Sequence, residues 1–148
     1  MTTKNKQHKG ELSYYGLSLL SFLREDFPDR AEDVVFIRER ADHAAEVYSQ
    51  AIENGLSHIE AENLASDELF RGLAFSPYNT LVNIIWNEFS GEISEDEAQS
   101  VALQILPLCS NVLAKYSLSD DFIDTPEYDH LYTELTGTIQ ILLEDGKL

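Results

Sequence analysis

The stretch "SPYNTLVNIIWNEF", residues 76–89, decides the fold. Ser76 followed by Pro77 is a favoured helix start, because the serine side chain caps an amide and proline lacks an amide that the first turn would leave unpaired. The apolar residues then recur every three or four positions, which predicts one broad buried face: Tyr78, Leu81, Val82, Ile85, Trp86 and Phe89. Ile84 lies off that face, so the helix is predicted to be central and more than half buried.

Apolar residues follow the same period on both sides of this helix, over residues 12–23, 34–52, 61–73, 98–116 and 128–142, and each of these runs predicts a helix. Within the last helix, "TGTIQI" at residues 136–141 would fit a strand equally well by itself. The sequence therefore predicts an all-α fold, a single compact, bundle-like domain of about six helices over residues 11–148. Residues 1–10 are predicted to form a flexible basic tail.

Residue types at the helix ends predict where each helix begins and stops. Capping boxes are predicted at Asp29 with Glu32, Ser57 with Glu60, and Ser94 with Glu97. Gly55 is predicted to close the second helix in a left-handed conformation, and Thr125 to cap the last helix ahead of Pro126. Pro107 is predicted to kink the fifth helix about one turn earlier.

The helix over residues 34–52 has an alanine-rich face, formed by Ala41, Ala44, Ala45 and Ala51. Small side chains allow a second helix to approach closely. The sequence favours packing within the domain for this face, with a homodimer interface as the alternative.

The composition is strongly acidic, since 27 Asp and Glu residues against 10 Lys and Arg give a net charge of −17. Residues 72–148 hold 13 acidic residues and two lysines, a net charge of −11. Proteins that bind phosphates show clustered Lys and Arg instead, so direct binding to nucleic acid is disfavoured. The acidic surface either keeps the protein in solution or binds a basic protein partner. A more specific version of the second alternative is that the protein imitates nucleic acid.

The single cysteine, Cys109, allows no intrachain disulfide. It lies within the apolar period with no cation beside it, so it is predicted to be a buried apolar side chain and no nucleophile. The chain starts without a signal-peptide pattern and lacks the roughly 18–20 consecutive apolar residues of a membrane helix. These features predict a soluble, cytoplasmic protein without a membrane partner. The lack of nucleophile and phosphate-loop motifs favours a protein that is not an enzyme.

Asp120, Asp121 and Asp124 form the D-D-x-x-D spacing that prenyl-diphosphate enzymes use to hold Mg²⁺. Such a site needs the first and last carboxylates on one continuous helix face. Here Pro126 pushes Thr125 out of the helical region, so the run lies between two helices. The motif is therefore interpreted as a short turn capped by Ser119.

Glu127, His130 and Glu134 lie at spacings of three and four on one flank of the last predicted helix. A carboxylate and an imidazole on such a strip can bind iron or zinc. The other histidines do not supply the second E-x-x-H motif of a di-iron bundle. The sequence therefore favours a solvated acidic strip and no cofactor, with a metal-dependent enzyme as the alternative.

Asn79, Asn83 and Asn87 recur every fourth residue along the helix over residues 77–89. The structural interpretation is a hydrogen-bonded network that fixes neighbouring elements, because buried amides need partners. The functional interpretation is a groove that binds a peptide backbone, with Trp86 as its aromatic anchor.

Three stretches together carry a family resemblance: "ELSYYGLSLLSFLRE", "RGLAFSPYNTLVNIIWNEF" and "DDFIDTPEYDHLYTELTGTIQI". They resemble a Bacteroidales family of short acidic proteins of unknown function, often carried on conjugative transposons. The resemblance runs from about Glu11 to near the C-terminus. It implies an all-helical domain and a mobile-element setting, and it implies no activity or site residue.

The sequence as a whole favours a non-enzymatic protein-interaction module whose acidic surface binds a basic partner. A narrower hypothesis, based on the charge and on the resemblance, is a nucleic-acid mimic that serves a mobile element.

Overall fold

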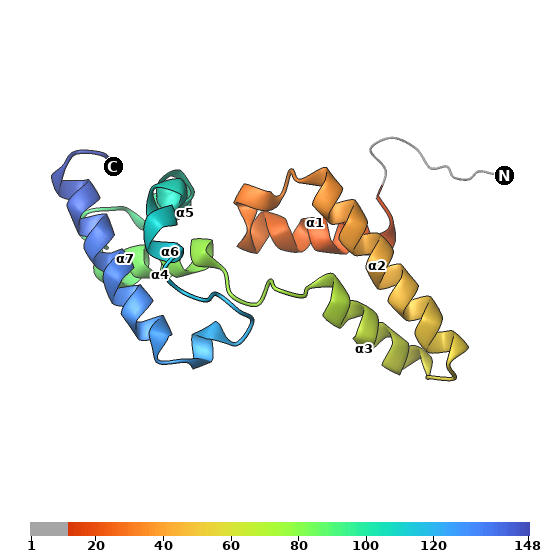
Figure 1. The fold of residues 1–148 in the computed structure, drawn as a ribbon. Coiled ribbons are helices and arrows are strands. Elements are labelled where there is room, and N and C mark those ends of the chain that lie inside the picture. Colours follow the sequence, from red (N-terminus) through yellow and green to blue (C-terminus); the bar gives the residue numbers. More distant parts are fainter. Residues whose placement is uncertain (1–11) are drawn as a thin grey trace. The chain divides into compact units, whose positions relative to one another are not determined.

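The structure, a computed structural model, describes residues 12–148 and is built from helices (Figure 1). Across these residues no strand occurs, so the prediction of an all-α fold is confirmed. The predicted tail at residues 1–10 lies outside the described residues. The chain forms two compact units, called here unit 1 (residues up to 25 and 30–71) and unit 2 (residues 26–29 and 72–148). The predicted single domain over residues 11–148 stays a prediction.

Unit 1 contains α1 (Tyr14–Asp26, whose last residue belongs to unit 2), α2 (Val34–Glu53) and α3 (His58–Leu69). Figure 1 shows α2 and α3 side by side, and they make the most extensive contact between two helices of the described chain. Alanines are buried on both helices: Ala41, Ala44, Ala51, Ala61 and Ala65. The alanine-rich face thus packs within the chain, while Ala45 is exposed. A homodimer stays a prediction.

The turn between α2 and α3 follows the predicted capping pattern. Gly55 has a φ of +91°, a conformation that glycine adopts without strain. Ser57 and Glu60 form the predicted capping box, with the serine hydroxyl accepting from the Glu60 amide at 3.1 Å.

The predicted capping box of Asp29 and Glu32 is wrong. The chain forms a separate 3₁₀ turn at Pro28–Arg30. Asp29 lies within this turn, and α2 begins only at Val34. Asp33 caps α2 instead, and its carboxylate accepts from the Phe36 amide at 3.1 Å. Two aspartates precede this helix, and sequence alone did not show that the first one belongs to another turn.

Unit 2 is built around α4 (Pro77–Glu88), which contacts α5 (Ala98–Ile105) and α7 (Glu127–Glu144). Ser76 caps α4 as predicted by accepting from the Asn79 amide at 3.0 Å, and Pro77 is the first helical residue. The large aliphatic side chains of the unit's core with no exposed surface are Leu81, Ile84, Ile85, Ile105, Leu131, Leu135 and Ile139. Each contributes about 1.5–3 kcal/mol on burial, so α4 is central, as predicted.

The fifth predicted helix is divided as the proline requires. α5 ends at Ile105, a 3₁₀ turn follows at Leu106–Cys109, and α6 (Ser110–Leu113) completes the run. Cys109 is buried as predicted, and burial raises the pKa of its thiol to about 11.

The predicted capping box of Ser94 and Glu97 is wrong, because the first turn is a 3₁₀ helix at Glu95–Glu97 and the Ser94 side chain makes no capping bond.

The start of α7 also differs from the prediction. Thr125 does not cap it, since its hydroxyl donates backward to the Phe122 carbonyl at 2.7 Å. That carbonyl belongs to a 3₁₀ turn at Phe122–Asp124. Carbonyl groups at the end of such a short turn lack helical hydrogen-bond donors, and the threonine hydroxyl supplies one. α7 continues through Gly137, so "TGTIQI" is helical. Among the described residues, no helix is long and apolar enough to cross a membrane.

Candidate functional site

The exposed flank of α4 carries three of the four residues that the sequence singled out for binding. Asn83, Trp86 and Asn87 are exposed there, while Ile84 and Ile85 are buried beneath them. The Trp86 side chain is 42% exposed, which is high for the largest apolar side chain in the protein. Its indole N–H donates to the Glu95 carbonyl at 3.3 Å, which holds the ring at the surface beside the loop that follows α4.

The three asparagines do not form one buried ladder. Residues four apart on an α-helix advance by about 40° each, so the row drifts around the helix. Asn79, at the start, is half-buried, and its amide donates to the Asp26 carboxylate at 3.0 Å. Asn83 and Asn87 are exposed. The structure thus gives Asn79 a structural contact and leaves Asn83 and Asn87 on the surface beside Trp86.

The end of α4 is tied to α7 through a tyrosine. The Tyr132 hydroxyl donates to the Glu88 carboxylate at 3.1 Å and accepts from the Asn87 amide at 3.3 Å. Partial burial raises the pKa of Tyr132; Asn87 opposes this shift and Glu88 adds to it. This pair of bonds orients the polar side chains at the C-terminal end of α4, and sequence periodicity gave no sign of it.

Acidic residues follow Trp86 closely. The exposed carboxylates within residues 88–97 are Glu88, Glu92, Glu95, Asp96 and Glu97. We call this group, together with Asn83, Trp86 and Asn87, the tryptophan surface. Unit 2 as a whole holds 15 acidic residues and two lysines, a net charge of −13. One of the lysines, Lys115, forms an ion pair with Glu134. The tryptophan surface is therefore an aromatic side chain within a strongly negative unit.

The predicted metal ligands are brought together only in part. The His130 imidazole lies 3.6 Å from the Glu127 carboxylate. Glu134 instead binds Lys115 with one oxygen and accepts from the Tyr116 hydroxyl at 2.7 Å with the other, and Lys115 lowers the pKa of the Glu134 carboxyl. Within residues 12–148, no group of three His, Cys, Asp or Glu side chains is arranged to hold a metal. Iron or zinc binding stays a prediction.

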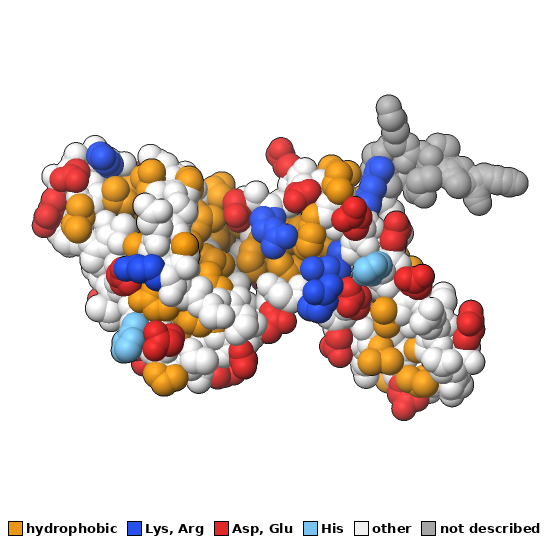
Figure 2. Space-filling model, viewed as in Figure 1, with side chains coloured by type: hydrophobic (Ala, Val, Ile, Leu, Met, Phe, Trp, Pro, Cys, Tyr) orange, Lys and Arg blue, Asp and Glu red, His pale blue; other side chains and the backbone are white. Residues whose placement is uncertain are grey.

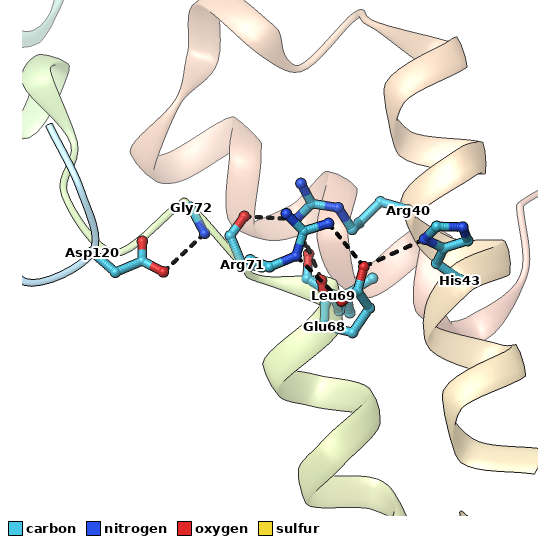
Figure 3. Close-up of polar contacts among 7 residues, drawn as sticks. All are labelled: Arg40, His43, Glu68, Leu69, Arg71, Gly72 and Asp120. Carbon is cyan, nitrogen blue, oxygen red and sulfur yellow. Dashed lines mark hydrogen bonds and ion pairs between the residues drawn. The ribbon is translucent and has the colours of Figure 1, made fainter. Parts of the chain in front are cut away.

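The aspartates of the D-D-x-x-D motif do not act together, because Asp120 and Asp121 accept hydrogen bonds from different donors. Asp120 accepts from the backbone amides of Gly72 at 2.9 Å and Ala74 at 3.1 Å, and Figure 3 shows the first of these bonds. Asp121 accepts from the Ser119 hydroxyl at 2.7 Å. Asp120 thus fixes a loop in unit 2, where Gly72 has a φ of +82°. The predicted local turn occurs at Phe122–Asp124, but the predicted Ser119 cap is wrong, because no side chain caps this turn. The sequence also missed the long-range role of Asp120.

A polar cluster in unit 1 was also missed. The Arg40 guanidinium donates to the carbonyls of Glu68, Leu69 and Arg71, at 3.3, 3.1 and 2.7 Å (Figure 3). These groups lie at the C-terminal end of α3, where carbonyls lack helical partners and attract cations. The arrangement is a long-range helix cap, and its residues are more than 25 positions apart in the sequence.

Glu68 is the acidic centre of the same cluster. Its carboxylate accepts from the Arg71 Nε and Nη2 at 3.2 and 3.0 Å, and lies 3.4 Å from the His43 imidazole. Hydrogen bonding from Arg71 lowers the pKa of Glu68. Because these charged groups satisfy one another and the end of α3, we interpret the cluster as structural.

The helices and the tryptophan surface define a class: an all-α protein with a strongly acidic helical unit. The chain belongs to the family described as domain of unknown function DUF1896, which matches residues 7–148. It is similar to protein PG0816 from Porphyromonas gingivalis, known from a crystal structure, with 44% identity and a TM-score of 0.87 over 92% of this chain and 93% of that chain. No match is found among curated proteins. The predicted family of unknown function is confirmed, whereas its Bacteroidales and transposon setting stays a prediction.

Proposed function

We propose that the protein is an interaction module whose tryptophan surface binds a segment of a partner protein rich in Lys and Arg. The observation that supports this most is Trp86, which is 42% exposed, contacts the Glu95 carbonyl and is followed in the sequence by five exposed carboxylates. Exposed tryptophan is enriched at the centre of protein interfaces, and its ring attracts cations. The carboxylates supply the charge complementarity that steers a basic partner.

The charge of unit 2 supports the same conclusion. With a net charge of −13, unit 2 repels nucleic acid and anionic lipid and attracts cationic protein segments. Imitation of nucleic acid, in the service of a mobile element, is a narrower form of this proposal. It requires that the partner also binds DNA, and competition between this protein and DNA for such a partner tests it.

Trp86 is the only tryptophan, so its fluorescence reports on the proposed surface alone. Acetylated octalysine amide should change the emission in a saturable manner, more weakly as salt is raised, whereas octaglutamate should not. Replacing both carboxylates in E92Q/E95Q should weaken octalysine binding by roughly 1.4- to 5-fold per residue, the range for exposed ion pairs. Both residues are exposed, and among the described residues neither side chain forms an ion pair that the variant would break.

The matched control is D129N/D145N, which removes the same charge from exposed positions near the two ends of α7. If both double variants weaken binding equally, octalysine recognises only the net charge of the protein and the tryptophan surface has no special role. An unchanged Trp86 emission at saturation would overturn the proposal as well.

A further inference from the structure

A pocket in unit 1 carries chemistry that the tryptophan surface does not use. It lies between α1 and the start of α2, and its volume is about 410 Å³. Its lining is Leu12, Leu20, Arg24, Ala31, Glu32, Val34, Ile37 and Arg38. The volume falls within the range of small-molecule pockets, about 300–1,000 Å³.

The lining combines an aliphatic wall with two guanidinium groups. The charged residues of the lining are Arg24, Arg38 and Glu32, so the pocket is net positive in a protein of charge −17. In the part of the chain that the structure describes, neither arginine forms an ion pair. The Nε donor of Arg38 is buried and finds no acceptor among the described residues. A buried donor in this state is costly, so an anion that satisfies it binds with a gain.

In a second pocket of unit 1, by contrast, the arginines have structural partners. That pocket, about 520 Å³, is lined by Phe36, Glu39, Arg40, Asp42, His43 and Arg71. There the Arg40 guanidinium donates to three carbonyls and Arg71 forms a fork with Glu68. No comparable structural partner accounts for Arg38 among residues 12–148, which makes its pocket the better candidate for a ligand.

We propose that the pocket between α1 and α2 binds a small amphipathic anion, a carboxylate with an aliphatic body. Once its guanidinium turns toward the ligand, Arg38 can donate from Nε and Nη together to the two carboxylate oxygens, the fork geometry that arginine favours. Arg24, which is exposed, adds a second positive charge to the lining. The aliphatic body packs on Leu20, Val34 and Ile37. This site is independent of the tryptophan surface.

Calorimetric titration of the full chain with octanoate tests the proposal. Two analogues of the same length serve as comparisons: octanol, which is neutral, and octylamine, which is cationic. Octanoate should bind with a Kd of about 1 mM, a usual affinity for a ligand of this size. Octanol should bind more weakly, and octylamine should not bind. Equal binding of octanol and octanoate, or no binding of octanoate, would overturn the proposal.

Variants place the binding in this pocket. R38Q should weaken octanoate binding by about 10-fold or more, R24Q by less, and E32Q should strengthen it because it removes the only carboxylate of the lining. The matched control is R30Q, an arginine of the same unit outside the pocket, which should leave binding unchanged. If R38Q is unfolded by circular dichroism, R24Q and E32Q decide the question through their opposite signs. Equal losses in R24Q and R30Q would contradict the proposal.

Discussion

Unit 1 and unit 2 divide the charges of the chain unequally. The described part of unit 1 has 11 acidic residues and five arginines, a net charge of −6, whereas unit 2 has a net charge of −13 and no arginine. On the face shown in Figure 2, acidic side chains lie on both units, and the largest blue patches lie on unit 1. In unit 1, Arg40 and Arg71 form structural bonds, whereas Arg24 and Arg38 line the pocket proposed above as an anion site.

The two units also differ in what holds them together. Unit 2 buries large aliphatic side chains around α4, whereas α2 and α3 of unit 1 meet through alanines and are joined by the Arg40 cap. Small side chains bury little apolar area each, so polar contacts carry a larger share of the stability in unit 1. The predictions below test this difference.

The largest effect is expected in the core of unit 2. Ile84 has no exposed surface, so Ile84→Ala leaves a cavity and should lower the free energy of unfolding by about 2–5 kcal/mol. Urea unfolding followed by Trp86 fluorescence measures this loss. The control is Ile141→Ala on α7, at a side chain 58% exposed, which should cost well under 1 kcal/mol. Similar losses in the two variants would contradict the proposed core.

A smaller effect is expected at the cap in unit 1. Arg40→Met keeps the stem but leaves the carbonyls at the end of α3 without their donor, and should cost about 1.5–3 kcal/mol. Arg30→Met is the control, because the guanidinium groups of Arg30 and Arg40 both lie over the Phe36 ring, 4.2 and 4.9 Å from its centroid, but only Arg40 donates to these carbonyls. Urea unfolding followed by circular dichroism compares the two. A loss in the Arg30 variant as large as in the Arg40 variant would show that stacking, and not capping, is the stabilising contact.

The smallest effect is a pH dependence at Glu68. The folded pKa of Glu68 lies below its ordinary value of 4.5, so the unfolded chain binds the proton more readily. The stabilisation is therefore present above pH 4.5 and is lost as the pH falls through the folded pKa. Glu68→Gln should lower stability at pH 7 and reduce the further loss of stability on acidification. If the wild type and Glu68→Gln lose equal stability between pH 7 and pH 3, Arg71 does not stabilise the charged form of Glu68.

Helix positions were predictable because apolar periodicity is a local signal. α4 and its Ser76 cap, the Gly55 turn and the break near Pro107 all follow from residues within a few positions of one another. The wrong caps at Asp29, Ser94 and Thr125 share a cause, since a 3₁₀ turn takes part in each and residue type does not distinguish it from an α-helical turn.

The candidate site was only partly predictable. Sequence placed Trp86 on the buried face of α4 and, as an alternative, made it the aromatic anchor of a groove, whereas periodicity did not show that the residue is 42% exposed. The bonds of Tyr132 to Asn87 and Glu88 join residues more than 40 positions apart. The contacts of Asp120 and Arg40 are similarly distant in sequence. Periodicity contains no information on such pairs.

The most direct test of the central claim is a map of amide chemical shifts in the full ¹⁵N-labelled protein during titration with octalysine. The largest changes should fall within residues 83–97, around Trp86 and the carboxylates that follow it. Changes spread evenly over the acidic residues of unit 2, with none larger around Trp86, would contradict it.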